Sequence, residues 1–315
     1  MVMRVASLVC GVLLSLALSA CTGSAGRGPS ASADAFTGTP ASPSPSPTPT
    51  ASGAIQHVVI IVEENKPAQL IIGNPAAPYL NTLAKSSAQA SDYSAIRHPS
   101  LPNYLALTSG TTAGITSDCN PPGGWCLSTG PNLAQALDRA GRSWRMYAES
   151  MPAPCTAENT SVYAVKHNPF LYFPSVTADP TYCAGHDVPY DLLTADLATT
   201  TSLPDFALIS PNLCDDMHDC SIAHGDAWLQ ANIPRILDSP AFTRQRSLLV
   251  VTFDEGDASD NVVPCLFAGP AARADTVSAQ PFTHYSLLRT VEDAWGLPPL
   301  TGEDAAAAPM TALLR

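Results

Sequence analysis

The chain has 315 residues with 15 basic and 27 acidic side chains, and its net charge is −12 at pH 7. Only three of the basic residues are Lys, which excludes a nucleic-acid-binding protein because that class needs a basic surface. No segment after residue 20 reaches the roughly 20 apolar residues of a membrane span, which excludes a polytopic membrane protein. Residues 1–53 hold two basic and one acidic side chain, so the remaining 262 residues carry a net charge of −13.

The N-terminal 21 residues predict export. Arg4 followed by the apolar run Val5–Leu18 is typical of a secretory signal. The run leads into Leu-Ser-Ala-Cys, which resembles a bacterial lipobox, so residues 1–21 are predicted to be a lipoprotein signal peptide with Cys21 as the lipidation site. An ordinary cleavage site with an incidental Cys is the alternative. We therefore expect an outward-facing lipoprotein, held on the bacterial cell membrane by its acyl chains, or a secreted protein.

Residues 22–53 predict a linker. Of these 32 residues, 29 are Gly, Ala, Ser, Thr or Pro. Such a segment cannot bury enough apolar surface to offset the entropy lost on ordering, so it is predicted to be a disordered tether. Its Pro-rich part, residues 40–49, is expected to act as a semi-extended spacer.

The remaining residues, 54–315, contain seven Cys. In an exported protein these favour disulfides, and an odd number leaves at least one thiol unpaired. The spacing suggests the pairs Cys119–Cys126, Cys214–Cys220 and Cys155–Cys183. Cys265 lies in an apolar run and is expected to be a buried free thiol. No CxxC pair is present, so a thiolate zinc site is not expected.

Strands and helices are predicted to alternate along residues 54–315. Buried-type strands are predicted at His57–Val62, Ser143–Tyr147, Asp205–Ile209, Leu248–Phe253 and Val262–Phe267. Helices are predicted at Pro78–Ala90, Asn132–Ala140, Ile222–Leu237 and Ser286–Trp295. This alternation predicts an α/β fold with a mostly parallel sheet and helices on both faces. Residues 148–204 lack periodicity and are interpreted as a lid or insertion.

Acidic residues follow three of the predicted strands. Glu63-Glu64-Asn65-Lys66 follows the first, Asp215 to Asp219 lies after the strand ending at Ile209, and Asp254-Glu255-Gly256-Asp257 follows the strand ending at Phe253. Ligands of such folds bind beyond the carboxyl ends of the strands, which lie at one edge of the sheet. Clustered carboxylates repel one another unless a cation neutralises them. We therefore predict a metal site at this edge.

Ser100 is a candidate nucleophile. It lies in His98-Pro99-Ser100-Leu101-Pro102, just before a predicted short helix whose first turn suits Pro102. A simple helix cap is the structural alternative. A nearby cation would favour the nucleophile, because it lowers the pKa of a hydroxyl group. No G-x-S-x-G motif surrounds any Ser, which argues against a serine-hydrolase triad.

These motifs together resemble a known family. They are Glu64-Asn65 after a buried strand, the Pro-Ser-Leu-Pro-Asn-Tyr turn, Asp216-Met217-His218-Asp219, Gly225-Asp226-Ala227-Trp228-Leu229 and Asp254-Glu255. The chain is similar, from about His57 to Leu297, to the bacterial phosphoesterase/acid phosphatase branch of the alkaline phosphatase superfamily. The resemblance implies an alkaline-phosphatase-like α/β fold, with residues 54–315 as the catalytic domain. It also implies metal-assisted hydrolysis of phosphomonoesters, which is an acid phosphatase activity.

The resemblance also implies roles for individual residues. Ser100 matches the nucleophile, which becomes a phosphoserine and also contacts the metal. The implied metal ligands are Glu64, Asn65, Asp254 and Glu255, with Asp216 and Asp219 as further candidates. Asn103, His218 and His284 are candidates for stabilising the transferred phosphoryl group or protonating the leaving group. Candidate substrate-binding residues are Lys66, Arg97, His98, Lys166 and His167.

The metal and the substrate stay open at this stage. Oxygen ligands favour Mg²⁺ or Ca²⁺, whereas added His ligands favour Zn²⁺. The expected substrate is a phosphomonoester, with a phosphoinositide such as phosphatidylinositol 3-phosphate or another lipid head group as a candidate. A phospholipase C-type phosphodiesterase is one alternative, in which Phe170, Tyr172 and Phe173 of the lid contact lipid. A non-enzymatic surface-binding lipoprotein is the other. We expect a monomer.

Overall fold

Strand β1 (His57–Glu63) lies in the middle of the sheet, and all seven of its residues are buried. It pairs in parallel with β6 (Phe206–Ser210) on one side and with β7 (Ser247–Phe253) on the other. The continuous apolar runs of these strands suit a parallel sheet that is covered on both faces. The structure is a computed structural model that describes residues 53–257 and 260–315.

The main sheet has eight strands in the order β5-β4-β6-β1-β7-β8-β2-β9. Its other strands are β2 (Ala88–Ala90), β4 (Trp144–Ala148), β5 (Asp187–Pro189), β8 (Cys265–Ala268) and β9 (Thr276–Ser278). Every pair is parallel except the two that involve β8. The predicted mostly parallel α/β sheet is therefore confirmed. Two short strands, β3 (Tyr93–Ser94) and β10 (Phe282–Thr283), form a second, two-stranded sheet.

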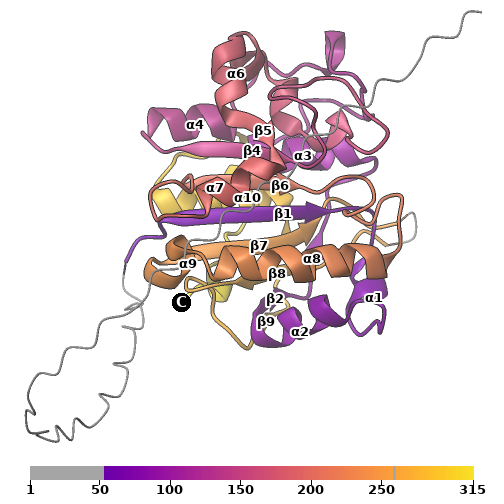
Figure 1. Ribbon diagram of the computed structural model, residues 1–315, viewed down its shortest axis with the longest axis vertical. Coiled ribbons are helices and arrows are strands. Elements are labelled where there is room, and N and C mark those ends of the chain that lie inside the picture. The colour runs from indigo at the N-terminus through magenta and orange to yellow at the C-terminus, as the bar shows by residue number, and fades with distance from the viewer. Residues whose placement is uncertain (1–52, 258–259) are drawn as a thin grey trace, which may run out of the picture. The chain divides into compact units, whose positions relative to one another are not determined.

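Helices cover both faces of the sheet, as predicted: α8 crosses in front of it and α10 lies behind it (Figure 1). Helix α3 packs against α10, and α2 packs against α8. The longer helices are α2 (Pro78–Ser86), α3 (Ser100–Ser109), α8 (Ile222–Leu237) and α10 (His284–Trp295). The shorter ones are α1 (Ala68–Ile71), α4 (Leu133–Arg139), α5 (Pro174–Thr177), α6 (Pro180–His186), α7 (Leu193–Asp196), α9 (Pro240–Arg244) and α11 (Gly302–Ala306).

Three predicted element boundaries differ from the observed ones by two residues or more. The helix predicted over Pro78–Ala90 ends at Ser86, and its last residues form β2 between β8 and β9. Tertiary pairing decides this segment, because Ala88 and Ala90 are buried on the sheet while Gln89 is not. Strand β8 begins at Cys265 rather than Val262, and α10 begins two residues before the predicted Ser286.

Residues 148–204 contribute to the sheet and to the core. They supply β5 at one edge of the sheet and three single-turn helices, η2 (Val165–His167), η3 (Pro169–Tyr172) and η4 (Tyr190–Leu192). Phe170, Tyr172 and Phe173 are fully buried. The interpretation of these three aromatic rings as lipid contacts is therefore wrong, because they pack inside the protein.

The cysteines pair as predicted. Disulfides join Cys119 to Cys126, Cys155 to Cys183 and Cys214 to Cys220. Cys265 is a buried free thiol within β8.

The predicted signal peptide, Cys21 and residues 22–52 of the linker lie outside the described residues. Within the residues that are described, no helix is both long and apolar enough to cross a membrane.

Candidate active site and metal-binding group

The three acidic strand ends meet at one edge of the sheet. Strands β6, β1 and β7 are parallel neighbours, so the residues that follow them come together. The backbone N–H of Glu64 donates to the carbonyl oxygen of Asp216 at 2.8 Å, and the N–H of Asn65 donates to Asp254 Oδ1 at 3.1 Å. Asn65 has φ of 57°, a left-handed conformation that Asn adopts more readily than most residues. The turn after β1 thus places Asn65 beside Asp254, and both are predicted metal ligands.

Ser100 is the first residue of α3, and its hydroxyl faces the strand ends. Pro99 occupies the capping position and no side chain caps the helix, so the interpretation of Ser100 as a simple cap is wrong. Instead, Ser100 Oγ donates to Glu64 Oε2 at 3.1 Å. Tyr104, one turn further along α3, donates its hydroxyl to Glu64 Oε1 at 2.5 Å. Both side chains lie on the same face of the helix, because residues four apart are neighbours there.

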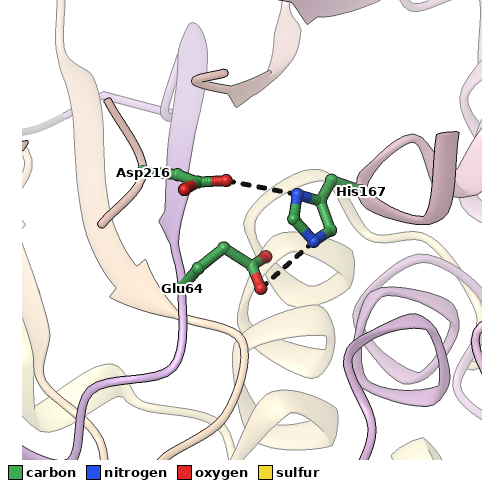
Figure 2. A group of neighbouring side chains, drawn as sticks. All are labelled: Glu64, His167 and Asp216. Carbon is green, nitrogen blue, oxygen red and sulfur yellow. Dashed lines mark ion pairs between the residues drawn. The ribbon is translucent and has the colours of Figure 1, made fainter. Parts of the chain in front are cut away.

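Glu64, His167 and Asp216 form a buried group of possible metal ligands. Their side chains point toward one another from the end of β1, from η2 and from the loop after β6 (Figure 2). One ligand atom from each lies within 4.8 Å of the other two. His167 Nε2 is 3.2 Å from Glu64 Oε2, and His167 Nδ1 is 3.2 Å from Asp216 Oδ2. His167 Nε2 and Asp216 Oδ2 are buried without a hydrogen-bond partner among the described residues. One ring nitrogen of His167, with one carboxylate oxygen each from Glu64 and Asp216, could therefore bind a cation.

Asn65, Asp254 and Glu255 add oxygen atoms beside this group. Asp254 Oδ1 accepts from the N–H groups of Asn65 and Glu255, at 3.1 Å and 2.6 Å. Asp254 Oδ2 and Asn65 Oδ1 are buried and have no hydrogen-bond partner among the described residues. Carboxylate and amide oxygens are the ligands that hard divalent cations prefer. The donor set therefore fits a divalent cation, as predicted for these strand ends.

The pKa values show how strongly the carboxylates interact. Burial raises the pKa of Asp254 well above its usual range, and the charges of Glu64 and Glu255 raise it further. Burial, followed by the charge of Glu64, raises the pKa of Glu255 to about 8. Burial would also raise the pKa of Glu64, but the charge and contacts of His167 lower it to about 2. Glu64 is therefore an ionised carboxylate, which accepts the hydrogen bond of Ser100.

Lys166 and His218 lie at the rim of the site with Asp118, a residue that the motifs did not indicate. Asp118 Oδ1 accepts from the N–H of Leu101 at 3.2 Å, and Asp118 Oδ2 accepts from Lys166 Nζ at 3.1 Å. Lys166 Nζ also donates to His218 Nε2 at 3.3 Å. Burial would lower the pKa of Lys166, but the charges of Glu64 and Asp118 raise it above its usual value. Lys166 is thus a cation close to Ser100, suited to a phosphate oxygen.

Asp219 does not join the buried group of ligands. Its exposed carboxylate pairs with His218 Nδ1 at 2.7 Å. Since Lys166 Nζ donates to the other ring nitrogen, His218 carries its proton on Nδ1 in this arrangement. Asp219 therefore orients the His218 ring and is not placed as a metal ligand.

Asn103 and His284 hydrogen-bond to backbone groups around the site. Asn103 Nδ2 donates to the carbonyl of Arg97 at 2.7 Å and its Oδ1 accepts from two backbone N–H groups, so it fixes the turn before Ser100 and is not free to bind a phosphoryl oxygen. His284 Nε2 donates to the carbonyl of Asp254 at 2.6 Å, while Tyr93 donates its hydroxyl to His284 Nδ1. Burial lowers the pKa of His284 to about 4. A neutral ring with both nitrogens engaged is not placed to protonate a leaving group.

The other predicted substrate contacts lie further out. His98 Nδ1 is 2.9 Å from Glu255 Oε2, so this ring supports a candidate metal ligand. Lys66 Nζ donates to the carbonyl of Met217 at 2.9 Å. Arg97 is exposed, and its Nε donates to the carbonyl of His98. The structure brings neither Lys66 nor Arg97 into hydrogen-bond contact with Ser100.

The Gly-Asp motif at the start of α8 has a structural role. A Cβ atom on Gly225 would lie 2.4 Å from Met217 Cγ and 2.8 Å from the carbonyl oxygen of Asp215. Only Gly therefore lets α8 approach the loop that carries Asp216. Asp226 accepts from the N–H groups of Tyr79 and Leu80, which satisfies the first turn of α2.

Asn168, the residue after His167, forms a buried pair with Asp187 of β5. Asn168 Nδ2 donates to Asp187 Oδ1 at 2.8 Å. Asn168 Oδ1 and Asp187 Oδ2 are buried without a hydrogen-bond partner among the described residues. Burial raises the pKa of Asp187 from the ordinary 3.8 to about 7, although the hydrogen bond from Asn168 opposes this.

The Asp187→Asn substitution is expected to raise stability at pH 8 but not at pH 4. The folded wild-type protein holds a proton on Asp187 that the unfolded chain releases, so this contribution is complete below pH 3.8 and is lost as the pH rises through about 7. An amide at position 187 accepts the same hydrogen bond from Asn168 without titrating. We therefore compare the free energy of unfolding of the variant with that of the wild type. The variant's advantage should increase by about 1–3 kcal/mol from pH 4 to pH 8. Denaturant unfolding of both proteins measures it, and parallel pH profiles would contradict the expectation.

Comparisons with known proteins identify the family of this chain. The chain is 40% identical over 257 residues to the phosphatidylinositol-3-phosphatase of Mycobacterium tuberculosis, covering 81% of each chain. It is 34% identical over 244 residues to a phosphate-repressible acid phosphatase of Penicillium chrysogenum, covering 72% of this chain but 57% of that protein. The sequence model of the Phosphoesterase family matches residues 73–298.

The chain belongs to the phosphoesterase family. It is therefore an enzyme, a phosphoric ester hydrolase, and the alternative of a non-enzymatic surface protein is set aside. A protein of the alkaline phosphatase superfamily from Vibrio parahaemolyticus has the same fold, with a TM-score of 0.57, 13% identity, and coverage of 82% of this chain and 70% of that one. The predicted alkaline-phosphatase-like fold is confirmed.

Sequence reasoning missed two residues in the site of this phosphoesterase, Tyr104 and Asp118. Tyr104 carried a usable signal, because it lies four residues after Ser100 on the same helix. Asp118 carried none, since it lies in a loop between α3 and α4 that no periodicity or strand end marks. Only the fold brings Asp118 to the first turn of α3.

Proposed function

We propose that this phosphoesterase is an acid phosphatase that hydrolyses phosphomonoesters through a phosphoserine on Ser100. The observation that carries the proposal is the buried Ser100 hydroxyl at the start of α3, which donates to the ionised carboxylate of Glu64. The first turn of α3 and the cation of Lys166 lie beside it, and both suit a phosphate group. The names of the curated relatives support the same activity.

In this mechanism Ser100 Oγ attacks phosphorus in line with the leaving oxygen while its proton passes to Glu64. The ester oxygen leaves with a proton from Lys166. Water then attacks the phosphoserine, the proton held by Glu64 returns to Ser100 Oγ, and the proton released by the water restores Lys166. Lys166, at the rim, is the group placed to donate to the leaving oxygen, and His218 Nε2 accepts from its Nζ. Asn103 and His284 act as positioning residues, because they fix the turn before Ser100 and the backbone of Asp254.

We further propose that Glu64, Asn65, His167, Asp216, Asp254 and Glu255 supply the ligands of a divalent metal. When bound, such an ion supplies a Lewis acid that stabilises negative charge on phosphoryl oxygens and lowers the pKa of a hydroxyl. The oxygen atoms favour Mg²⁺ or Ca²⁺, and His167 makes Zn²⁺ a third candidate.

The proposed substrate is a phosphoinositide monoester, such as phosphatidylinositol 3-phosphate. Its support is the name of the mycobacterial relative, which matches over 81% of both chains. The phospholipase C-type alternative is tested with p-nitrophenyl phosphate and bis-p-nitrophenyl phosphate. A preference for the diester would overturn the phosphomonoesterase proposal.

We also propose that the protein is exported and anchored through Cys21. The support is the signal-like segment in residues 1–21, and the three disulfides suit an oxidising compartment. Labelling with a radioactive fatty acid in the native host tests the anchor, and an unlabelled, fully secreted protein would contradict it.

Removing divalent metal is expected to abolish hydrolysis of p-nitrophenyl phosphate. Six potential ligands lie at one edge of the sheet, and several of their buried atoms have no other partner. The activity of the full chain is measured before and after chelation and dialysis, and then with Mg²⁺, Ca²⁺ or Zn²⁺ added back singly. Restoration by one ion identifies it, while full activity after the metal content has fallen to zero would contradict the metal proposal.

A further inference from the structure

Asp118 binds two groups that also suit a phosphate. Its Oδ1 accepts from the backbone N–H of Leu101 at 3.2 Å, and its Oδ2 accepts from Lys166 Nζ at 3.1 Å. A carboxylate and a phosphate select the same partners, because both present negative oxygens to helix N–H groups and to Lys. Leu101 directly follows Ser100 in α3, so a phosphoryl group at Ser100 Oγ would lie next to the same N–H.

The start of α3 has few backbone donors to share. Pro99 and Pro102 have no N–H, so among residues 99–102 only Ser100 and Leu101 can donate one. An N–H carries a single hydrogen, and Asp118 accepts that of Leu101. A phosphoryl group therefore competes with the Asp118 carboxylate for one of the two donors in this turn.

The Asp118 carboxylate also places a negative charge beside the site. The side chain of Lys166 is only 13% exposed and pairs with Asp118, so part of its positive charge is already compensated. Burial and then the charge of Glu64 raise the pKa of Glu255, and the charge of Asp118 raises it further. A phosphate that approaches Lys166 thus meets a like charge at short range, which weakens its binding.

The backbone of Asp118 is held in place, but its side chain can turn outward. The hydroxyl of the buried Tyr172 donates to the carbonyl oxygens of Asp118 and Cys119, at 3.3 Å and 3.1 Å. The disulfide Cys119–Cys126 closes the loop that follows. The Asp118 side chain itself is 31% exposed, and a side chain at the surface changes rotamer without moving the backbone. Asp118 can therefore leave Leu101 and Lys166 by rotation of its own side chain.

We propose that the Asp118 carboxylate stands in for phosphoryl oxygens at Leu101 and Lys166, and that a phosphate must displace it to bind. Asp118 is then a competitor built into the site. Its return to these two donors weakens the binding of inorganic phosphate, the product, and speeds product release. This inference rests on the proposed phosphomonoesterase function and adds a regulation of that same site.

Binding of inorganic phosphate tests the proposal. For the full chain as isolated, Kd is measured by calorimetry, and KM and kcat are measured with p-nitrophenyl phosphate. Asp118→Ala is expected to lower the Kd of phosphate about fivefold, because the ligand no longer has to break a partly exposed ion pair and a hydrogen bond. KM should fall by a similar factor, while kcat should not rise because the product leaves more slowly.

Asp118→Asn separates the ion pair from the hydrogen bond. The amide oxygen still accepts from the N–H of Leu101, but the neutral side chain no longer pairs with Lys166. This variant should therefore lower the Kd of phosphate by a smaller factor, about two- to threefold.

Asp205→Asn is the matched control. Asp205 Oδ2 accepts from the N–H of Ser143 at 3.0 Å, and Oδ1 lies 3.8 Å from Arg142 Nη1. This carboxylate thus has the same two kinds of partner as Asp118 and a similar exposure, 28%. It precedes β6, whereas the site follows the other end of that strand, so the Kd of phosphate should not change.

Weaker binding of phosphate in both Asp118 variants would overturn the proposal and show that Asp118 only positions Lys166. An unchanged Kd, or no phosphate binding in either the wild type or Asp118→Ala, would also overturn it. If phosphate binds but no ester is hydrolysed, the proposed function fails. The Kd values then still decide whether Asp118 competes with phosphate.

Discussion

Replacing Ser100 by Ala is expected to reduce phosphatase activity on the order of 10⁴-fold or more, as happens in other enzymes that lose their nucleophile. Ser100 Oγ donates to Glu64 at the point where α3 begins, and no other hydroxyl on α3 except that of Tyr104 contacts this carboxylate within the described residues. Rates are measured with p-nitrophenyl phosphate. Acid quenching during turnover, followed by mass analysis, should find phosphate on the peptide containing Ser100 in the wild type and not in the variant.

Ser109→Ala is the matched control for this substitution. Ser109 is buried at the other end of the same helix, where its hydroxyl donates to the carbonyl oxygens of Leu105 and Thr111. Losing these bonds costs stability of about 1 kcal/mol but leaves the site intact, so activity should stay within about twofold. Full activity in Ser100→Ala, or a phosphoryl group on another residue, would show that Ser100 is not the nucleophile.

Replacing Glu64 by Gln is expected to lower both activity and metal content, each by more than about 100-fold. The two carboxylate oxygens of Glu64 accept from Ser100 and Tyr104, and Oε2 also lies 3.2 Å from His167 Nε2. An amide has one oxygen fewer and no negative charge, so it is a weaker ligand and a poor acceptor for the proton of Ser100. Steady-state kinetics and elemental analysis of the dialysed protein measure the two effects.

The neighbouring residue offers a control of the same type. Glu63 is also fully buried, but neither of its carboxylate oxygens has a hydrogen-bond partner among the described residues. Burial, followed by the charge of Asp216, raises the pKa of Glu63 well above its usual range, so the group is already neutral. Glu63→Gln should therefore keep the metal and the activity. Equal losses of metal and activity in Glu63→Gln and Glu64→Gln would contradict this expectation. They would mean that any buried carboxyl group here is required, whatever its contacts.

How much of the site was predictable differs from residue to residue. Glu64 and Asp254 were found because they follow apolar runs, and parallel strands bring their carboxyl ends to one edge. Ser100 was found from its place before a helix. The roles of Asn103 and His284 were not, because the partners of a side chain depend on which backbone groups the fold brings against it. Each of these two side chains is occupied by backbone carbonyls that no sequence pattern marks.

Short helices and strands were also not predictable from the sequence pattern. The segment Ala88–Ala90 continues the apolar spacing of α2, yet it forms a strand because β8 and β9 lie on either side of it. Residues 148–204 carry no periodic signal, yet they provide β5, the buried aromatic rings and His167. Such short elements are stabilised by non-local contacts rather than by their own propensities.

The sequence by itself determined the α/β class, the three disulfides and the acidic strand ends, because hydrophobic period and short spacings are local properties of the chain. It also marked Ser100 as the candidate nucleophile. The tertiary structure alone decided that His167 and Asp216 face Glu64 and that Asp118 holds Lys166 at the first turn of α3. These contacts join residues far apart in the chain, so they exist only once the sheet has brought the strand ends together.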